Sequence, residues 1–151
     1  MADYETLILQ REVACAPDRL FHVITDRDLR QKWSAPDDER VVIIDEYDCR
    51  PGGREETRCG PKDAPEFNTT GLFHVVTPEF LCFTETLVVG GQTMSISLCS
   101  HEISKSDTGS SLRVTLQITS LVGTDLFDDY RGGWSASLDN LTTLVSELDQ
   151  S

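Results

Sequence analysis

One long amphipathic segment near the C-terminus constrains the fold more than any other feature of this sequence. Between Thr124 and Asp149, apolar side chains recur every three or four residues: Phe127, Tyr130, Trp134, Leu138, Leu141, Val145 and Leu148. This spacing predicts a single long helix with one apolar stripe. Thr124 or Asp125 can cap its start, and the acidic residues of the first turn suit the positive end of the helix dipole. The stripe must be buried against another part of the chain.

Seven runs with alternating or β-branched residues precede this helix and predict the sheet on which it packs. They are Thr6–Ala14, Val41–Tyr47, Arg54–Arg58, Gly71–Thr77, Phe80–Val88, Thr93–Ile103 and Leu112–Thr119. Turn-forming residues separate them, including the Pro-Gly-Gly of residues 51–53. Two short helices, at 16–25 and 26–33, are expected after the first strand, with Pro17 at the first helical position. Strands with segregated helices predict an α+β domain with an antiparallel sheet.

The charge of the chain argues against several classes of partner. There are 13 Lys and Arg residues against 26 Asp and Glu residues, a net charge of −13. The densest basic cluster contains Arg50, Arg54, Arg58 and Lys62. Two glutamates interrupt this cluster, which is too weak a patch for a nucleic-acid backbone. No apolar stretch approaches the ~18 residues of a membrane span, and the N-terminal residues do not resemble a secretory signal. We therefore expect one cytoplasmic domain over residues 1–151, without nucleic-acid binding or membrane insertion.

Motifs that would indicate a cofactor or an enzyme are missing from the sequence. The five cysteines form no CxxC pair, so we expect reduced thiols and no metal site. There is no P-loop, GxGxxG or GxSxG motif. The stretch CRPGGREETRCG, residues 49–60, is rejected as a phosphate-binding loop because its glycines lead into a strand rather than a helix. We expect no cofactor and assign no catalytic residue.

A predicted hairpin brings two polar residues close together. If Pro78 and Glu79 form its two-residue loop, His74 lies opposite Phe83 and Leu72 lies opposite Glu85. His74 and Glu85 are then diagonal neighbours on one mostly apolar face of the sheet. Such a pair can orient a polar ligand group or transfer protons. The alternative is a structural or solvated hydrogen bond.

Two adjacent glycines, Gly132 and Gly133, interrupt the otherwise well-patterned helix. Each destabilises a helix interior by roughly 1 kcal/mol relative to alanine. Their presence indicates either that a strand approaches closely or that space must stay open at this position. Tyr130 and Trp134 flank the glycines, and amphipathic aromatic residues of this kind commonly line ligand pockets.

Four segments of the chain resemble a known family. They are APDRLFHVITDRDLRQKW, DCRPGGR, GLFHVVTPEFLCFTE and GGWSASLDNLTTL. In this order they are similar to the START-like (SRPBCC) superfamily, and within it to the domain of activators of the heat-shock protein 90 ATPase. The resemblance implies a helix-grip fold, in which a curved antiparallel sheet of six or seven strands wraps around the C-terminal helix and leaves a cavity. It implies no catalytic residue.

Binding of a small apolar or aromatic molecule in this cavity is the function that we expect. The expected lining consists of Trp33, Phe83, Met94, Tyr130, Trp134 and Leu138, with His74 and Glu85 as polar groups. Trp33 either packs in the core or, by the resemblance, acts as a gate at the cavity mouth. Two alternatives stay open: a co-chaperone-like module with a chaperone as its partner, and a cyclase- or hydratase-like enzyme that uses the same cavity.

Overall fold

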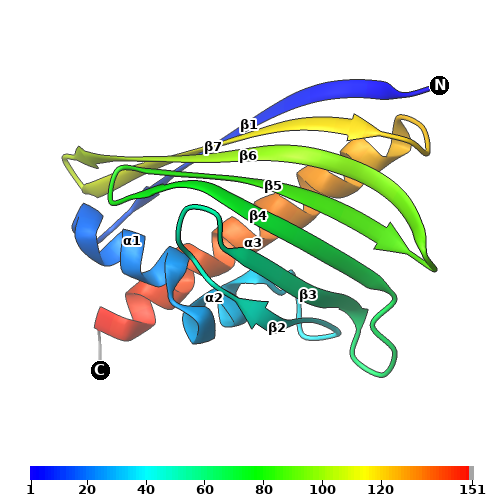
Figure 1. The fold of residues 1–151 in the computed structure, drawn as a ribbon. Helices are drawn as coiled ribbons and strands as arrows, with labels where there is room; N and C mark the ends of the chain where they lie inside the picture. The colour runs from blue at the N-terminus through cyan, green and yellow to red at the C-terminus, as the bar shows by residue number, and fades with distance from the viewer. Residues whose placement is uncertain (150–151) are drawn as a thin grey trace.

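Seven antiparallel strands form one curved sheet in the computed structural model, which describes residues 1–149 (Figure 1). The strands are β1 (Asp3–Val13), β2 (Arg40–Tyr47), β3 (Arg54–Pro61), β4 (Phe67–Thr77), β5 (Phe80–Val89), β6 (Gln92–Ser106) and β7 (Gly109–Ser120). Their order across the sheet is β1-β7-β6-β5-β4-β3-β2, so β1 and β2 are the edge strands. This architecture confirms the predicted α+β helix-grip fold.

Three helices cover the concave side of the sheet: α1 (Pro17–Thr25), α2 (Arg27–Ser34) and α3 (Asp125–Asp149). Pro17 is the first residue of α1, as its fixed φ predicts. Asp26 separates the two short helices, and its carboxylate accepts a hydrogen bond from the backbone N–H of Leu29 at 3.1 Å, which caps α2. Within residues 1–149, no helix has the length and apolar character needed to cross a bilayer.

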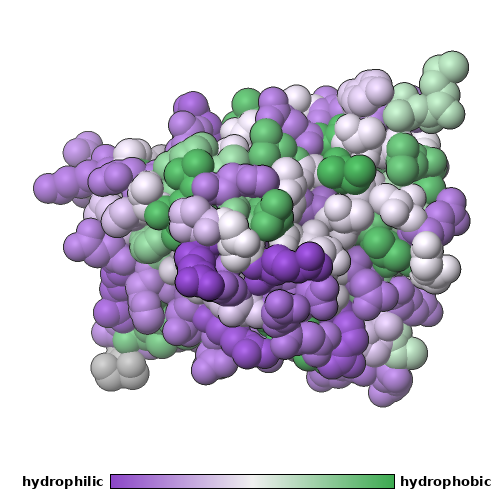
Figure 2. All heavy atoms as spheres, in the orientation of Figure 1, coloured by the Kyte–Doolittle hydropathy of each residue, from purple (hydrophilic) through white to green (hydrophobic). Residues whose placement is uncertain are grey.

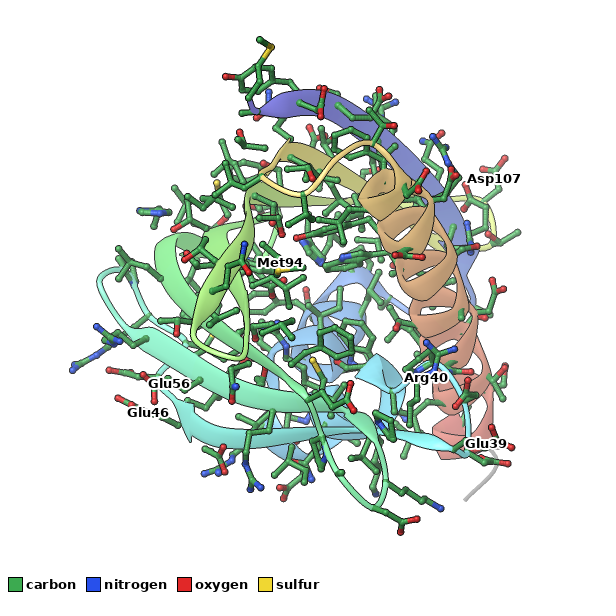
Figure 3. All side chains as sticks on the ribbon, turned by 90° about the vertical axis from the view of Figure 1, so that its right-hand side faces the viewer. Glu39, Arg40, Glu46, Glu56, Met94 and Asp107 are labelled. Atoms are coloured by element: carbon green, nitrogen blue, oxygen red, sulfur yellow. The ribbon has the colours of Figure 1, made fainter. Side chains whose placement is uncertain are left out.

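The predicted stripe of α3 packs against the sheet, but the two halves of the helix have different surroundings. In the C-terminal half, Leu138, Leu141 and Val145 are completely buried. They pack with α1 and with the inward residues of β1 and β7, such as Leu7 and Leu116, and so form the main core. The N-terminal half, which contains the two glycines, continues along the concave side of the sheet, away from α1 (Figures 1 and 3). The tightly packed core therefore lies around the C-terminal half of α3.

The loop between β2 and β3 confirms the turn predicted from Pro-Gly-Gly. Gly52 has a φ of +84°, a conformation that favours glycine. At Gly53, a side-chain Cβ would lie 1.9 Å from the carbonyl oxygen of Asp48, so only glycine fits there. Cys59 pairs with Val42 across these strands, and the thiols of both Cys49 and Cys59 are free.

Acidic partners neutralise three of the four basic side chains of this region. Arg50 pairs with Asp48, Arg54 with Glu56 and Arg58 with Asp45, at 2.7–3.2 Å. The basic cluster of the sequence is thus distributed over separate ion pairs. Figure 2 shows the outer side of the sheet as a mixture of hydrophilic and hydrophobic residues.

Candidate functional site

A cavity of about 680 Å³ lies between the N-terminal half of α3 and the β2–β5 side of the sheet. This volume is within the range of small-molecule sites. The inner wall includes Arg30 and Trp33 of α2, Glu55 and Thr57 of β3, Glu85 of β5, and Tyr130 and Trp134 of α3. The outer part is bordered by residues after α2, by Arg40 and Val42 of β2, by Phe67, and by Asp128 and Asp129.

Open space explains the two glycines of α3. Both Gly132 and Gly133 border the cavity, and a Cβ added at either position would meet no atom within 4 Å. A strand does not approach the helix here, so close packing is not the reason for glycine. Half-buried Gly133 leaves the cavity wall without a side chain, and exposed Gly132 lies at the rim, at a loss of helix stability of roughly 1 kcal/mol each.

Five aromatic rings form a continuous layer that reaches from β2 to α3. Tyr47 contacts Phe73, Phe73 contacts Phe83, Phe83 contacts His101, and His101 contacts Trp134, with ring centroids 5.6–5.8 Å apart. Tilted and edge-on pairs at these distances are favourable. Trp134 is the member that also lines the cavity, so this layer supports the wall from behind.

A buried ion pair lies in the cavity wall. The Arg30 guanidinium is 3.0 Å from Oε2 of Glu55, and both side chains are at most 10% exposed. Arg30 also lies over the rings of Tyr47 and Phe83, at 5.8 and 5.3 Å from their centroids. Burial alone would lower the pKa of Arg30, but Glu55 raises it above its ordinary value, so the guanidinium is charged. The other carboxylate oxygen of Glu55, Oε1, is buried and has no hydrogen-bond partner.

Glu85 places a second carboxyl group in the same wall. Strand register aligns Glu55, Gly71 and Glu85 in one row across β3, β4 and β5. Burial, reinforced by the charge of Glu55 and opposed by Arg30, raises the pKa of Glu85 to about 7. At neutral pH, Glu85 can therefore donate or accept a hydrogen bond. Burial raises the pKa of Glu55 as well, and the charge of Arg30 opposes that shift. Two neighbouring carboxyl groups with raised pKa values can bind a polar ligand group or move a proton.

Strand β6 presents its polar residues to the interior. Ser95, Ser97 and His101 are at most 1% exposed. The hydroxyl groups of Ser95 and Tyr130 are hydrogen-bonded at 2.6 Å. Burial, with the charge of Arg30, lowers the pKa of His101 to about 3, so this imidazole is neutral, and its Nδ1 atom has no hydrogen-bond partner.

Four of the eight predicted site residues line the cavity: Trp33, Glu85, Tyr130 and Trp134. Trp33 is 3% exposed, and its indole N–H donates to the carbonyl oxygen of Val23 at 3.0 Å. This bond holds the ring in the wall, which favours the packing alternative over a gate. Phe83 and Leu138 are buried in the core behind the cavity.

The other two predicted residues, His74 and Met94, lie elsewhere because β-bulges change the phase of their strands. The hairpin does turn at Pro78 and Glu79, but a register shift between Phe73 and Val75 pairs Phe73, rather than His74, with Phe83. His74 is exposed on the outer face, where its Nε2 is 3.1 Å from the Thr84 hydroxyl. The predicted His74–Glu85 pair is therefore wrong.

Met94 is the unpaired residue of a second bulge. Leu87 pairs with Ser95 and Val88 pairs with Thr93, so no residue of β5 lies opposite Met94. The bulge fixes the phase of β6, in which Ser95 and Ser97 face inward and Ile96 is 46% exposed. Met94 is not among the described residues that line the cavity. The structure therefore does not place Met94 in the lining in which the sequence predicted it.

Reasoning from sequence missed Arg30, Glu55 and His101. Helical spacing offered a signal for Arg30, because it lies three residues before Trp33 and shares its buried face. Strand alternation offered one for Glu55, which shares its buried face with Thr57. Nothing in the sequence indicated that these residues meet.

Most of the sequence matches a known protein family. The model of the family described as Activator of Hsp90 ATPase homolog 1-like protein matches residues 14–146. No curated protein matches the chain.

Solved structures with the same fold come from several bacteria. A putative uncharacterized protein from Rhizobium leguminosarum has 21% identity and a TM-score of 0.85, with 97% of each chain covered. The Mll3558 protein from Rhizobium loti has 26% identity and a TM-score of 0.83, with 95% of this chain and 98% of that chain covered. The AHSA1 protein from Silicibacter pomeroyi has 21% identity and a TM-score of 0.76, with 94% and 98% covered.

Proposed function

Because this chain belongs to the Activator of Hsp90 ATPase homolog 1-like protein family, we propose that it uses the family's fold to bind a small molecule between the sheet and α3. The ligand has an apolar or aromatic body and a polar end. The observation that carries this proposal is the open space of about 680 Å³ beside Gly132 and Gly133. A wall that combines aromatic faces with a few convergent polar groups is typical of small-molecule sites.

Energetics support a ligand rather than a packing defect. Two adjacent glycines in a helix interior and a buried ion pair beside a cavity all reduce stability relative to a filled apolar core. The other end of the molecule is well packed, with Leu138, Leu141 and Val145 fully buried. The same helix is thus filled along one half and open along the other, as a binding site requires.

Native mass spectrometry of the protein purified from its host tests this proposal. We expect a bound small molecule whose mass increment disappears when the protein is denatured. A second sample, in which the bound material has been removed by unfolding and refolding, should take up the extracted molecule again. Purified protein that carries no molecule and takes none up from a host extract would contradict the proposal.

A chaperone-binding role is the second candidate, favoured by membership of a family named for activators of the Hsp90 ATPase. This role would use the outer surface rather than the cavity, and Figure 2 shows that the outer side of the sheet carries both polar and apolar groups. Pull-down with an Hsp90-type chaperone, together with its ATPase rate, tests this role. Absence of both binding and a rate change would exclude it without affecting the cavity proposal.

A further inference from the structure

We propose that the cavity selects organic cations, with a protonated amine of the ligand lying between Glu55 and Glu85 and its aromatic body against the tryptophans of the wall. This inference rests on the proposed function, since it names the chemical class of the ligand in the same cavity. Four independent observations carry it.

An orphan acceptor marks the position of the missing group. The Glu55 side chain is only 4% exposed, and its Oε2 pairs with Arg30. Its other oxygen, Oε1, is buried and has no hydrogen-bond partner. A buried carboxylate oxygen without a donor destabilises a protein by about 1–3 kcal/mol or more. Glu55 also lines the cavity, so a ligand N–H group can supply this donor once the carboxyl group turns toward the cavity.

A glycine occupies the position between the two glutamates in the sheet. Gly71 lies between Glu55 and Glu85 in the row across the sheet. A Cβ at Gly71 would be 3.6 Å from both Cβ and Oε2 of Glu55, so the glutamate leans over the glycine. The row thus presents two carboxyl groups on either side of a residue without a side chain, an arrangement that suits a group with several N–H donors.

The charge around the cavity favours a positive ligand. Its lining contains five carboxylate residues, Asp37, Glu55, Glu85, Asp128 and Asp129, against two arginines, Arg30 and Arg40. Each arginine is already paired, Arg30 with Glu55 and Arg40 with Asp37. Figure 3 shows Arg40 on the side of α3, whereas Glu46 and Glu56 lie on the outer side of the β2–β3 pair. The net charge of −13 attracts cations from a distance.

Aromatic faces complete the site. Trp33, Tyr130 and Trp134 border the same cavity. Their rings attract a cation that passes within about 6 Å of a ring centroid, and they offer apolar surface to the body of the ligand. A neutral or anionic ligand would use this apolar surface but would bring no positive charge to Glu85.

Three probes that differ only in charge test the inference: 1-naphthylmethylamine, 1-naphthalenemethanol and 1-naphthoate. Equilibrium dialysis against the intact protein at about pH 8 keeps most of the amine and most of Glu85 charged. We expect the amine to bind at least about tenfold more tightly than the alcohol, the factor that corresponds to about 1.4 kcal/mol, and the acid to bind most weakly. In Glu85→Gln the advantage of the amine should fall by about tenfold, while binding of the alcohol is unchanged.

Glu46→Gln is the matched control, because it removes the same charge from an exposed position on the outer side of β2. This variant should keep the full preference for the amine. Equal binding of amine and alcohol by the wild type would overturn the inference and leave the proposed function intact. If Glu85→Gln still prefers the amine, the conclusion that Glu55 and Glu85 cause this preference would be overturned. Failure of all three probes to bind would overturn the proposed function and this inference together.

Discussion

Replacing Glu85 with glutamine should stabilise the protein above neutral pH and leave its stability unchanged in acid. The pKa of Glu85 is raised from 4.5 to about 7, first by burial and then by the charge of Glu55. Between these pH values the folded state binds more protons than the unfolded state, so the free energy of unfolding falls as the pH rises. The substitution Glu85→Gln removes the titrating group and should remove this loss.

The size of the effect follows from the pKa. One pKa unit corresponds to 1.36 kcal/mol, so a change from 4.5 to about 7 corresponds to roughly 3 kcal/mol once Glu85 is ionised. Because the side chain borders a cavity rather than packed atoms, screening reduces this value. We therefore expect Glu85→Gln to be about 1–3 kcal/mol more stable than the wild type at about pH 8.

Urea unfolding of the wild type and the variant at about pH 4 and about pH 8 measures this difference. The groups that act on Glu85, Arg30 of α2 and Glu55 of β3, are present in both proteins, so their own titration largely cancels in the comparison. Glu46→Gln, which changes an exposed glutamate, should show no such pH dependence. A variant that is no more stable than the wild type at about pH 8, or equally stabilised at both pH values, would refute the reasoning.

The other predictions concern the ion pair, the glycines and the buried histidine. Arg30→Met leaves Glu55 buried without a partner and should lower the free energy of unfolding by about 3–5 kcal/mol in urea, and Arg30→Met/Glu55→Gln should recover most of this loss. Gly133→Ala meets no neighbour and should raise helix stability by about 1 kcal/mol in the same assay. Since burial lowers the pKa of His101 to about 3, the wild type should lose stability as the pH falls below about 6.5, and thermal melts of His101→Phe should show a weaker loss.

The main elements of the fold were predictable because their signals are local. The stripe of α3 and the position of Pro17 depend on spacing along a few turns of chain, and both are found where the sequence placed them. Strand ends were less well predicted: β4 begins at Phe67, ahead of the expected Gly71, because residues 67–70 pair with both β3 and β5.

The site was only half predictable because it depends on strand register and on contacts between distant segments. One extra residue at the bulge in β4 moves His74 to the outer face, and such a bulge leaves no strong mark in the sequence. Likewise, Arg30 and Glu55 come from a helix and a strand that meet only in the folded molecule. Local patterns located the aromatic wall, but the charged centre required the tertiary structure.

The central claim is that the open side of α3 is a ligand site, and blocking it tests that claim most directly. In Gly133→Leu, the new side chain enters space that no atom occupies within 4 Å of its Cβ, so the helix is preserved. Equilibrium dialysis of the neutral probe 1-naphthalenemethanol, with the melting temperature measured in parallel, compares this variant with the wild type. We predict that the wild type binds the probe and that Gly133→Leu, with an equal or higher melting temperature, does not. Equal binding by the two proteins would contradict the account.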